Sequence, residues 1–369
     1  MLQCSSKPLH RHINVAFCFI RSQKQNFEAR NIPNKIPRSD NEGKSAIDTL
    51  GNPPLVTIFH PTTEMAIKTV AIAGGSGSIG KPIIESLVSS GFEVTVLARG
   101  DKPPVFAEPI RTTTVDYASH TSLVSALQGI DALISVLSGH GLDNQPALLD
   151  AAIKAGVSRF LPSEFGANTY IPLTSQIPIF QGKVAFQKLL AQRAEENPSL
   201  SYSLVVHGPL FDICLAGGLL CNVKNREMTI YDGGNNRFST TCLSDLGAVV
   251  VGILRNPEKT KNRAIFVEGA KLTQIKLLEM LEKVTQSTWT RKEETISDLD
   301  TAMRAELIKP QANPGVFVPG FLKVVIFGGS AYGADLNEQT PGLDNEIVGL
   351  NPYTEDGLET IVRSIVAQA

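Results

Sequence analysis

"KTVAIAGGSGSIGKPIIESLVSSGFEVTVLARG", residues 68–100, contains an unbroken pattern of strand, glycine-rich turn, helix and strand. Thr69–Ala73 is a short run of β-branched and apolar residues, which predicts a buried strand. The glycine-rich segment follows directly. Apolar residues then fall on one helical face before Gly91 ends the helix. Phe92–Ala98 predicts the second strand. This order gives the glycines the structural context that an isolated glycine pattern lacks.

The glycines of the turn are spaced as GxxGxxG, at Gly74, Gly77 and Gly80. One glycine permits a tight turn, one lets a pyrophosphate approach the backbone, and one lets the helix pack closely on the strand. Unpaired N–H groups at the start of the helix then face the negative phosphates. The turn therefore predicts dinucleotide binding through Gly74, Ser76, Gly77, Ser78, Ile79 and Gly80.

Basic residues follow the second strand, which ends in "VLARG". An Asp or Glu at this position hydrogen-bonds the ribose 2′-hydroxyl of NAD, whereas a cation suits the 2′-phosphate of NADP. Arg99 stands at this position and Lys102 follows shortly after, while Asp101 lies past the strand end. We therefore predict NADP(H) as the cofactor, with Arg99 and Lys102 at its 2′-phosphate.

The alternation of strands and helices continues beyond this unit. Strands are predicted at residues 110–117, 131–138 and 159–161, with helices at about 120–129 and 145–155 between them. This rhythm predicts an α/β fold with a Rossmann-type, doubly wound parallel sheet. Such sheets bind ligands beyond the C-terminal ends of their strands. Ser138 and Phe165 follow two of those ends, and we assign both to the cofactor site.

A lysine is the candidate catalytic residue. None of the six tyrosines has a lysine four residues later, so the tyrosine–lysine pair of ordinary short-chain dehydrogenases is absent. Lys183 begins the helix after the fifth strand, where a lysine can reach the nicotinamide ribose. There it can orient the cofactor or help to move a proton, because burial and a neighbouring positive ring lower its pKa. Lys188 lies on another helical face and is expected to be solvated.

His207 follows the strand that ends at Val206, in "VVHGPLFD". The imidazole can donate a hydrogen bond to a substrate or to the cofactor amide. It is equally compatible with a core histidine whose hydrogen bonds are satisfied.

Several segments resemble one protein family. "RFLPSEFG" (159–166), "FQGKVAF" (180–186) and "STTCLSDLGAVVVGIL" (239–254) are similar to the NmrA-like, isoflavone-reductase-like branch of atypical short-chain dehydrogenases, especially its fungal oxidoreductases. The resemblance covers about residues 66–369 and places the family's catalytic lysine at Lys183. It implies NADPH-dependent reduction of an aromatic or polyketide-like small molecule, in fungi often in secondary metabolism. The helix after Lys183 differs from that of the plant reductases, so their substrates are not carried over.

The second half of the chain has a different pattern. Residues 65–210 are predicted to be mainly nucleotide-binding, and 211–369 mainly a smaller α+β substrate lobe over the C-terminal side of the sheet. "MTIYDGGNNRFSTTC" (228–242) predicts a hairpin with its turn at Asp232–Asn236. The apolar run 316–327 predicts a core or pocket-lining helix. Six aromatic residues are candidates for an apolar substrate cleft: Phe165, Tyr170, Phe211, Phe317, Phe321 and Phe327.

Residues 1–64 differ in composition from everything after them. Their first thirty residues carry five Lys and Arg against one acid, and proline, glycine and polar residues follow. Three interpretations stay open: a disordered or misannotated extension before a natural start at Met65, a mitochondrial presequence, or a secretory signal that has no clear cleavage site. No chemistry is expected there, and residues 65–369 are predicted to form the NAD(P)-binding domain.

Bulk composition limits the partners. The net charge of −2 predicts no nucleic-acid surface, and no apolar run reaches the roughly 18 residues of a membrane span. The five cysteines show no metal-binding spacing, and their scatter fits a reducing compartment, so we expect a cytoplasmic protein, or a mitochondrial one if residues 1–64 are a presequence. A small-molecule substrate and a monomer or homodimer are expected.

Two functions fit these patterns. The first is an NADPH-dependent reductase in which Lys183 assists hydride or proton transfer. The alternative is a regulator of the NmrA type that senses NAD(P) without turnover. Known sensors of this type lack the catalytic lysine, so Lys183 favours the enzyme.

Overall fold

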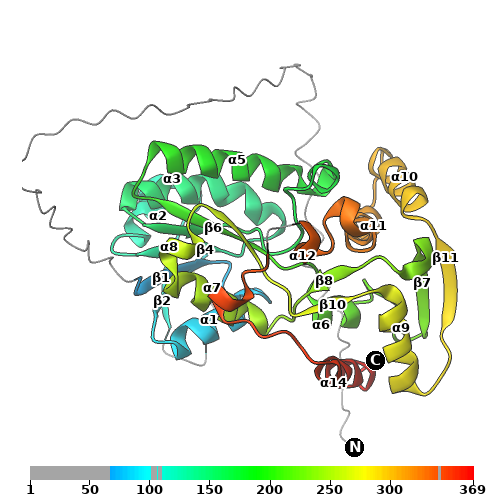
Figure 1. Ribbon diagram of the computed structural model, residues 1–369. Coiled ribbons are helices and arrows are strands. Elements are labelled where there is room, and N and C mark those ends of the chain that lie inside the picture. The colour runs from blue at the N-terminus through cyan, green and yellow to red at the C-terminus, as the bar shows by residue number, and fades with distance from the viewer. Residues whose placement is uncertain (1–66, 101–105, 107–109, 340–341) are drawn as a thin grey trace, which may run out of the picture. The chain divides into compact units, whose positions relative to one another are not determined.

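Seven parallel strands form the central sheet, in the order β3-β2-β1-β4-β5-β6-β9. The computed structural model describes residues 67–100, 106, 110–339 and 342–369 (Figure 1). The strands are β1 (Thr69–Ala73), β2 (Glu93–Ala98), β3 (Arg111–Thr114), β4 (Ala132–Ser135), β5 (Arg159–Leu161), β6 (Ser201–Val206) and β9 (Arg263–Phe266). The predicted doubly wound parallel sheet is confirmed, and β9 joins it from the second half of the chain.

Both faces of the sheet are buried under helices. In β1, Val70 and Ile72 belong to one core cluster, while Ala71 and Ala73 belong to the other, as expected for side chains that alternate across a strand. The first cluster is completed by α1 (Gly80–Ser89), α7 (Asp245–Arg255) and α13 (Asn345–Val348). The second is completed by α2 (His120–Ala126), α3 (Gln145–Ala155) and α5 (Gln181–Glu196).

Short helical segments connect these elements. They are η2 (Gly139–Asn144), α4 (Pro172–Ser175), η3 (Pro178–Phe180) and α8 (Pro257–Thr260). The segments η2, α4 and η3 all follow the C-terminal ends of β4 and β5, which is the edge where a doubly wound sheet binds ligands.

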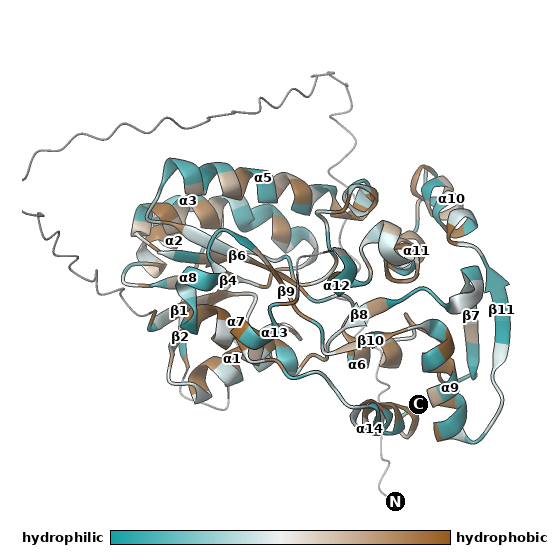
Figure 2. Cartoon of the chain, viewed as in Figure 1, coloured by the Kyte–Doolittle hydropathy of each residue, from teal (hydrophilic) through white to brown (hydrophobic). Residues whose placement is uncertain are grey.

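The remaining elements lie to one side of the sheet in Figure 1. They are α6 (Phe211–Ala216), β7 (Glu227–Tyr231), η4 (Asp232–Gly234), β8 (Phe238–Thr240), β10 (Ala270–Leu272), α9 (Gln274–Thr285), β11 (Thr290–Glu294), α10 (Ile296–Leu307), α11 (Pro314–Phe327), η5 (Gly329–Tyr332), α12 (Leu336–Gln339) and α14 (Glu355–Val366). The outer strand β11 is exposed along its length and hydrophilic (Figure 2). No helix in the described residues is both long enough and apolar enough to cross a membrane.

The predicted hairpin at residues 228–242 is wrong. β7 pairs in parallel with β11, and β8 pairs antiparallel with β10, so the two strands have different partners. Between them, Asp232, Gly233 and Gly234 all have positive φ, and η4 redirects the chain instead of closing a two-strand turn. β7 and β8 therefore each pair with a strand later in the chain, and not with each other as the local pattern predicted.

We expect Gly80→Ala to lower the free energy of unfolding by roughly 2 kcal/mol. A Cβ atom at Gly80 would lie 2.6 Å from Gly75 Cα and 2.7 Å from Gly74 O, both of which are backbone atoms that cannot rotate away. Urea unfolding measures the effect. Gly141→Ala is the control, because its nearest neighbour, Leu137 Cβ, lies at 3.4 Å, and equal effects of the two substitutions would contradict this packing argument.

Candidate active site

The glycine turn between β1 and α1 presents bare backbone to the C-terminal edge of the sheet. Gly74 has φ +90°, and a Cβ atom there would lie 2.7 Å from Val136 O. At Gly77 the nearest atom to a Cβ is Gly74 O, at 3.2 Å, so internal packing leaves more room there. The helix begins at Gly80 without a capping side chain or an acidic first turn. A close-approach glycine beside an uncapped helix start fits a pyrophosphate.

A cleft of about 320 Å³ opens over this turn, and we call it the turn cleft. Its lining is Gly77, Ser78, Ile79, Val136, Leu137, Ser138, Gly139, Leu142, Ser163, Phe165, Ile179, Phe180, Lys183, Val318 and Leu322. The structure thus brings together six residues that the sequence had singled out, namely Gly77, Ser78, Ile79, Ser138, Phe165 and Lys183.

The other predicted cofactor residues lie around the cleft or beyond it. Gly74 and Gly80 shape the turn from within, and Ser76 is exposed beside them. Arg99 is exposed directly after β2. Burial of the Tyr117 phenol raises its pKa to about 12, and the nearby positive charge of Arg99 partly opposes this rise. Lys102 lies outside the described residues.

Lys183 stands in the first turn of α5, half-buried. Its Nζ donates a hydrogen bond to the backbone carbonyl of Glu164, in the loop after β5, at 2.7 Å. Burial lowers the pKa of the Lys183 amine, and the negative charge of Glu164 opposes that shift. The amine is therefore held in place by the backbone, and its burial favours release of its proton.

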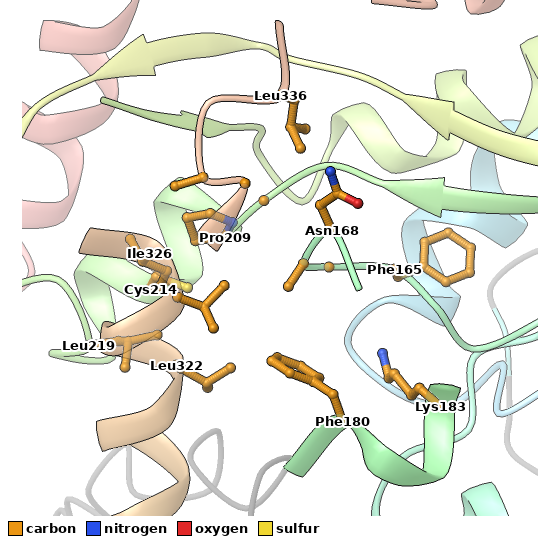
Figure 3. Close-up of a pocket in the computed structure, with 16 residues that line it drawn as sticks. Phe165, Asn168, Phe180, Lys183, Pro209, Cys214, Leu219, Leu322, Ile326 and Leu336 are labelled. Carbon is orange, nitrogen blue, oxygen red and sulfur yellow. The ribbon is translucent and has the colours of Figure 1, made fainter. Parts of the chain in front are cut away.

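A second cavity of about 180 Å³, the apolar pocket, lies beside the turn cleft. Its lining is Phe165, Gly166, Ala167, Asn168, Phe180, Lys183, Gly208, Pro209, Cys214, Leu219, Leu322, Val325, Ile326, Gly333, Ala334 and Leu336. Figure 3 shows the Lys183 amine and the Phe180 ring on one side of this pocket, with Leu219 and Leu322 on the other. Asn168, Lys183 and Cys214 are the lining residues with polar side-chain atoms, so the pocket suits a mainly apolar ligand.

The two cavities meet at Lys183. Four residues line both of them: Phe165, Phe180, Lys183 and Leu322. A ligand on the glycine turn and a ligand in the apolar pocket would therefore approach each other beside the amine. This shared wall is the central feature of the site.

A buried carboxylate anchors the far wall of the apolar pocket. Asp335 is fully buried, and its oxygens lie 2.9 Å from Lys271 Nζ and 3.3 Å from Arg237 Nε. Lys271 is in β10 and Arg237 precedes β8, so these pairs tie the segment with Gly333, Ala334 and Leu336 to the two-stranded sheet. The wall is thus held by a buried carboxylate that two partly exposed cations pair with, as well as by apolar packing.

His207 does not match either of its two interpretations fully. It is buried, with 2% of its surface exposed, yet neither ring nitrogen has a hydrogen-bond partner among the described residues. The backbone groups of His207 and Gly208 lie close enough to the imidazole to raise its pKa slightly. Neither makes a hydrogen bond of good geometry with a ring nitrogen. Burial, followed by the charge of Lys183, lowers the pKa of His207 to about 4, so the ring is neutral near pH 7. Both interpretations, a core histidine and a donor to a ligand, therefore stay predictions.

The predicted aromatic cleft needs correction. Of its six residues, only Phe165 lines the apolar pocket. Tyr170 is half-exposed, and the other four are buried in the core: Phe211, Phe317, Phe321 and Phe327. Phe180 and Leu322 take the expected role instead. Both had a signal in the sequence, because Phe180 precedes the helix of Lys183 and Leu322 lies in the apolar run predicted to line a pocket.

Fold and site together define the class of the protein: a Rossmann-type α/β protein with a dinucleotide-binding turn and an adjoining apolar pocket. The chain belongs to the NmrA-like family, whose family model matches residues 66–311. The resemblance stated from the motifs is confirmed.

Two relatives and one solved structure are informative. Oxidoreductase aprR of Aspergillus flavus is 34% identical over 229 residues, covering 61% of this chain and 76% of the relative. Pinoresinol reductase 1 of Arabidopsis thaliana is 28% identical over 306 residues, covering 77% of this chain and 92% of the relative. The binary complex of leucoanthocyanidin reductase and NADPH from Vitis vinifera matches with a TM-score of 0.65 at 20% identity, over 81% of this chain and 99% of that chain. This last likeness concerns the fold.

His207 should make the protein less stable in acid. The folded protein keeps the ring neutral down to about pH 4, whereas the unfolded chain protonates it near pH 6.5. Between these values the unfolded state binds more protons, so the free energy of unfolding falls as the pH is lowered. We expect His207→Gln to remove roughly 2 kcal/mol of the loss between pH 7 and pH 4.5, measured by urea unfolding.

The exposed His140 gives the matched control, because His140→Gln leaves the buried ring in place and should keep the wild-type pH dependence. An identical acid loss in wild type and His207→Gln would show that the buried ring is not responsible.

Proposed function

We propose that this protein is an NADPH-dependent reductase of an aromatic or polyketide-like small molecule, with Lys183 assisting hydride or proton transfer. One observation carries the proposal: the Lys183 amine lies on the wall shared by the turn cleft and the apolar pocket. Reduction by a nicotinamide needs cofactor and substrate side by side, with a proton donor within reach.

The relatives support the reaction class. The protein is an oxidoreductase, and its relative aprR carries that name. A second relative, pinoresinol reductase 1, is named for the reduction of pinoresinol. The matching leucoanthocyanidin reductase was solved with NADPH, which supports NADP(H) as the cofactor of this chain. The individual substrate and a place in secondary metabolism are part of the proposal.

Distinct residues would hold each part of the cofactor. The backbone from Gly77 to Ile79 and the uncapped start of α1 suit the pyrophosphate. Arg99, at the end of β2, suits the 2′-phosphate, and Ser138 and Phe165 suit the nicotinamide end. The bound cofactor supplies the hydride.

Lys183 acts on the proton and on placement. The carbonyl of Glu164 accepts one N–H of the amine, which fixes Nζ while its other hydrogens stay free to face a ligand. The lowered pKa makes the ammonium a better proton donor than a solvated lysine. The apolar lining excludes water and so strengthens the electrostatic effect of the amine on a bound substrate.

The alternative, a sensor of NAD(P) without turnover, explains less of the site. A sensor needs the turn cleft but has no need of an apolar pocket that shares its wall with the half-buried Lys183. Cytoplasmic location and a monomeric or homodimeric state stay predictions from the sequence.

Lys183→Ala should lower kcat by about a hundredfold or more while NADPH still binds. The alanine removes the proton donor but leaves the glycine turn and Arg99 intact. NADPH oxidation followed by absorbance gives the rate, and fluorescence titration gives the affinity. Lys188→Ala, five residues along the same helix and exposed, is the control. Full activity of Lys183→Ala would remove this mechanism.

Arg99→Ala should weaken NADPH binding by roughly tenfold to a hundredfold and NADH binding hardly at all, because only NADPH carries the 2′-phosphate. Titration of both cofactors measures the difference. Arg111→Ala is the control, because Arg111 is exposed on β3 and lies in register with Thr95 instead of with the end of β2. Equal losses for the two cofactors would refute the assignment of Arg99.

A further inference from the structure

The carboxylate of Glu164 is buried behind Lys183. Glu164 follows β5 and is 4% exposed. Its Oε2 accepts a hydrogen bond from Gln187 Nε2 at 2.8 Å, while Oε1 has no hydrogen-bond partner in the described part of the chain. A buried carboxylate with an unpartnered oxygen costs free energy unless a positive charge lies nearby.

One face of α5 is hydrogen-bonded to the loop that carries this carboxylate. Lys183 and Gln187 are one helical turn apart, so their side chains lie on the same face. Lys183 donates to the Glu164 backbone carbonyl at 2.7 Å, and Gln187 donates to both the Glu164 carboxylate and Thr169 Oγ1. These contacts hold the Lys183 amine against the backbone of Glu164 and the Glu164 carboxylate against the next turn of α5.

The two charges influence each other in the expected directions. Burial raises the pKa of the Glu164 carboxyl, and the charge of Lys183 opposes that rise. Burial lowers the pKa of the Lys183 amine, and the charge of Glu164 opposes that fall. Each group thus stabilises the ionised form of the other.

Other titratable groups around the pair do not supply this charge. His207, after β6, lies close enough to act on Lys183 but is neutral near pH 7. Tyr170, in the loop after β5, lies near Glu164, and burial raises the pKa of its phenol, so it is also neutral. Among the described residues, Glu164 is the acidic side chain whose charge, when ionised, acts on the Lys183 amine.

We propose that Glu164 is a positioning residue: its backbone carbonyl holds the Lys183 amine at the junction of the two cavities, and its buried carboxylate, held by Gln187, favours the protonated amine. The proposal deepens the proposed function and rests on it for the role of Lys183. Its physical content is independent of any substrate, because the coupling between the two side chains is a property of the protein alone.

The test is the pH at which Lys183 reacts with an amine reagent. Only the unprotonated amine reacts with acetic anhydride, so labelling against pH, followed by mass spectrometry of the peptide that contains Lys183, reports its protonation. Glu164→Gln keeps the size and the acceptor for Gln187 but removes the charge. We expect half-maximal labelling at lower pH, and at pH 8 about threefold or more labelling than in wild type.

Two further variants complete this experiment. Glu164→Asp keeps the charge and should label closer to wild type than Glu164→Gln does. Glu196→Gln makes the same change at an exposed position of α5 and should label like wild type. Identical labelling curves for wild type and Glu164→Gln would overturn the proposal.

Lys183→Met tests the same coupling from the other side, should Glu164→Gln not fold. Without the ammonium, the pKa of Glu164 rises further, so the folded state binds more protons than the unfolded state and stability falls as the pH rises. Urea unfolding at pH 5 and pH 8, with His207→Gln in both proteins so that this ring does not contribute, should show stability falling more with rising pH when Lys183→Met is added than when Lys183 is kept. An equal loss would also overturn the proposal.

The outcomes separate this proposal from the proposed function. Unchanged labelling in Glu164→Gln removes the role of Glu164 but leaves the reductase intact. Full turnover by Lys183→Ala removes the reductase mechanism but leaves the measured coupling between the two side chains intact.

Discussion

The close contact between bare backbone segments at the glycine turn is the constraint on which the site depends. A Cβ atom at Gly74 would lie 2.7 Å from Val136 O, and one at Gly80 would lie 2.6 Å from Gly75 Cα. Because neither residue carries a side chain, α1 begins directly beyond β1, close to the segment that leaves β4. The uncapped start of α1 therefore faces the same edge of the sheet at which β4 and β5 end, and the turn cleft opens there.

Two sets of contacts shape the proposed reaction site at this edge of the sheet. The hydrogen bond from Lys183 to the Glu164 carbonyl joins α5 to the loop after β5, and it places the amine between the turn cleft and the apolar pocket. On the other side, α11 supplies Leu322, Val325 and Ile326 to the pocket wall. In the proposed function, the turn cleft on the cofactor side and the apolar pocket on the substrate side thus meet at Lys183.

The sequence predicted the first half of this arrangement because its signals are local. The strand, turn and helix around Gly77 follow from spacing, whereas Lys183 was predicted from its place after the fifth strand and from the family resemblance. The hairpin at 228–242 failed because β7 and β8 pair with strands much later in the chain. Periodicity also could not choose a face of α11, which is apolar almost all round. Packing alone decides that Leu322 lines the pocket while Phe317 and Phe321 are buried. The unpartnered nitrogens of His207 likewise depend on three-dimensional neighbours that no motif specifies.

The central claim is that the turn cleft and the apolar pocket hold the two reactants of one hydride transfer. The most direct measurement uses NADPH with deuterium at the transferable position of the nicotinamide ring, together with a panel of aromatic and polyketide-like substrates. Mass spectrometry then follows the products. We expect a product that carries deuterium from the cofactor, formed in step with NADPH oxidation. Tight NADPH binding with no deuterium transfer to any member of a broad panel would contradict it and would favour a sensor.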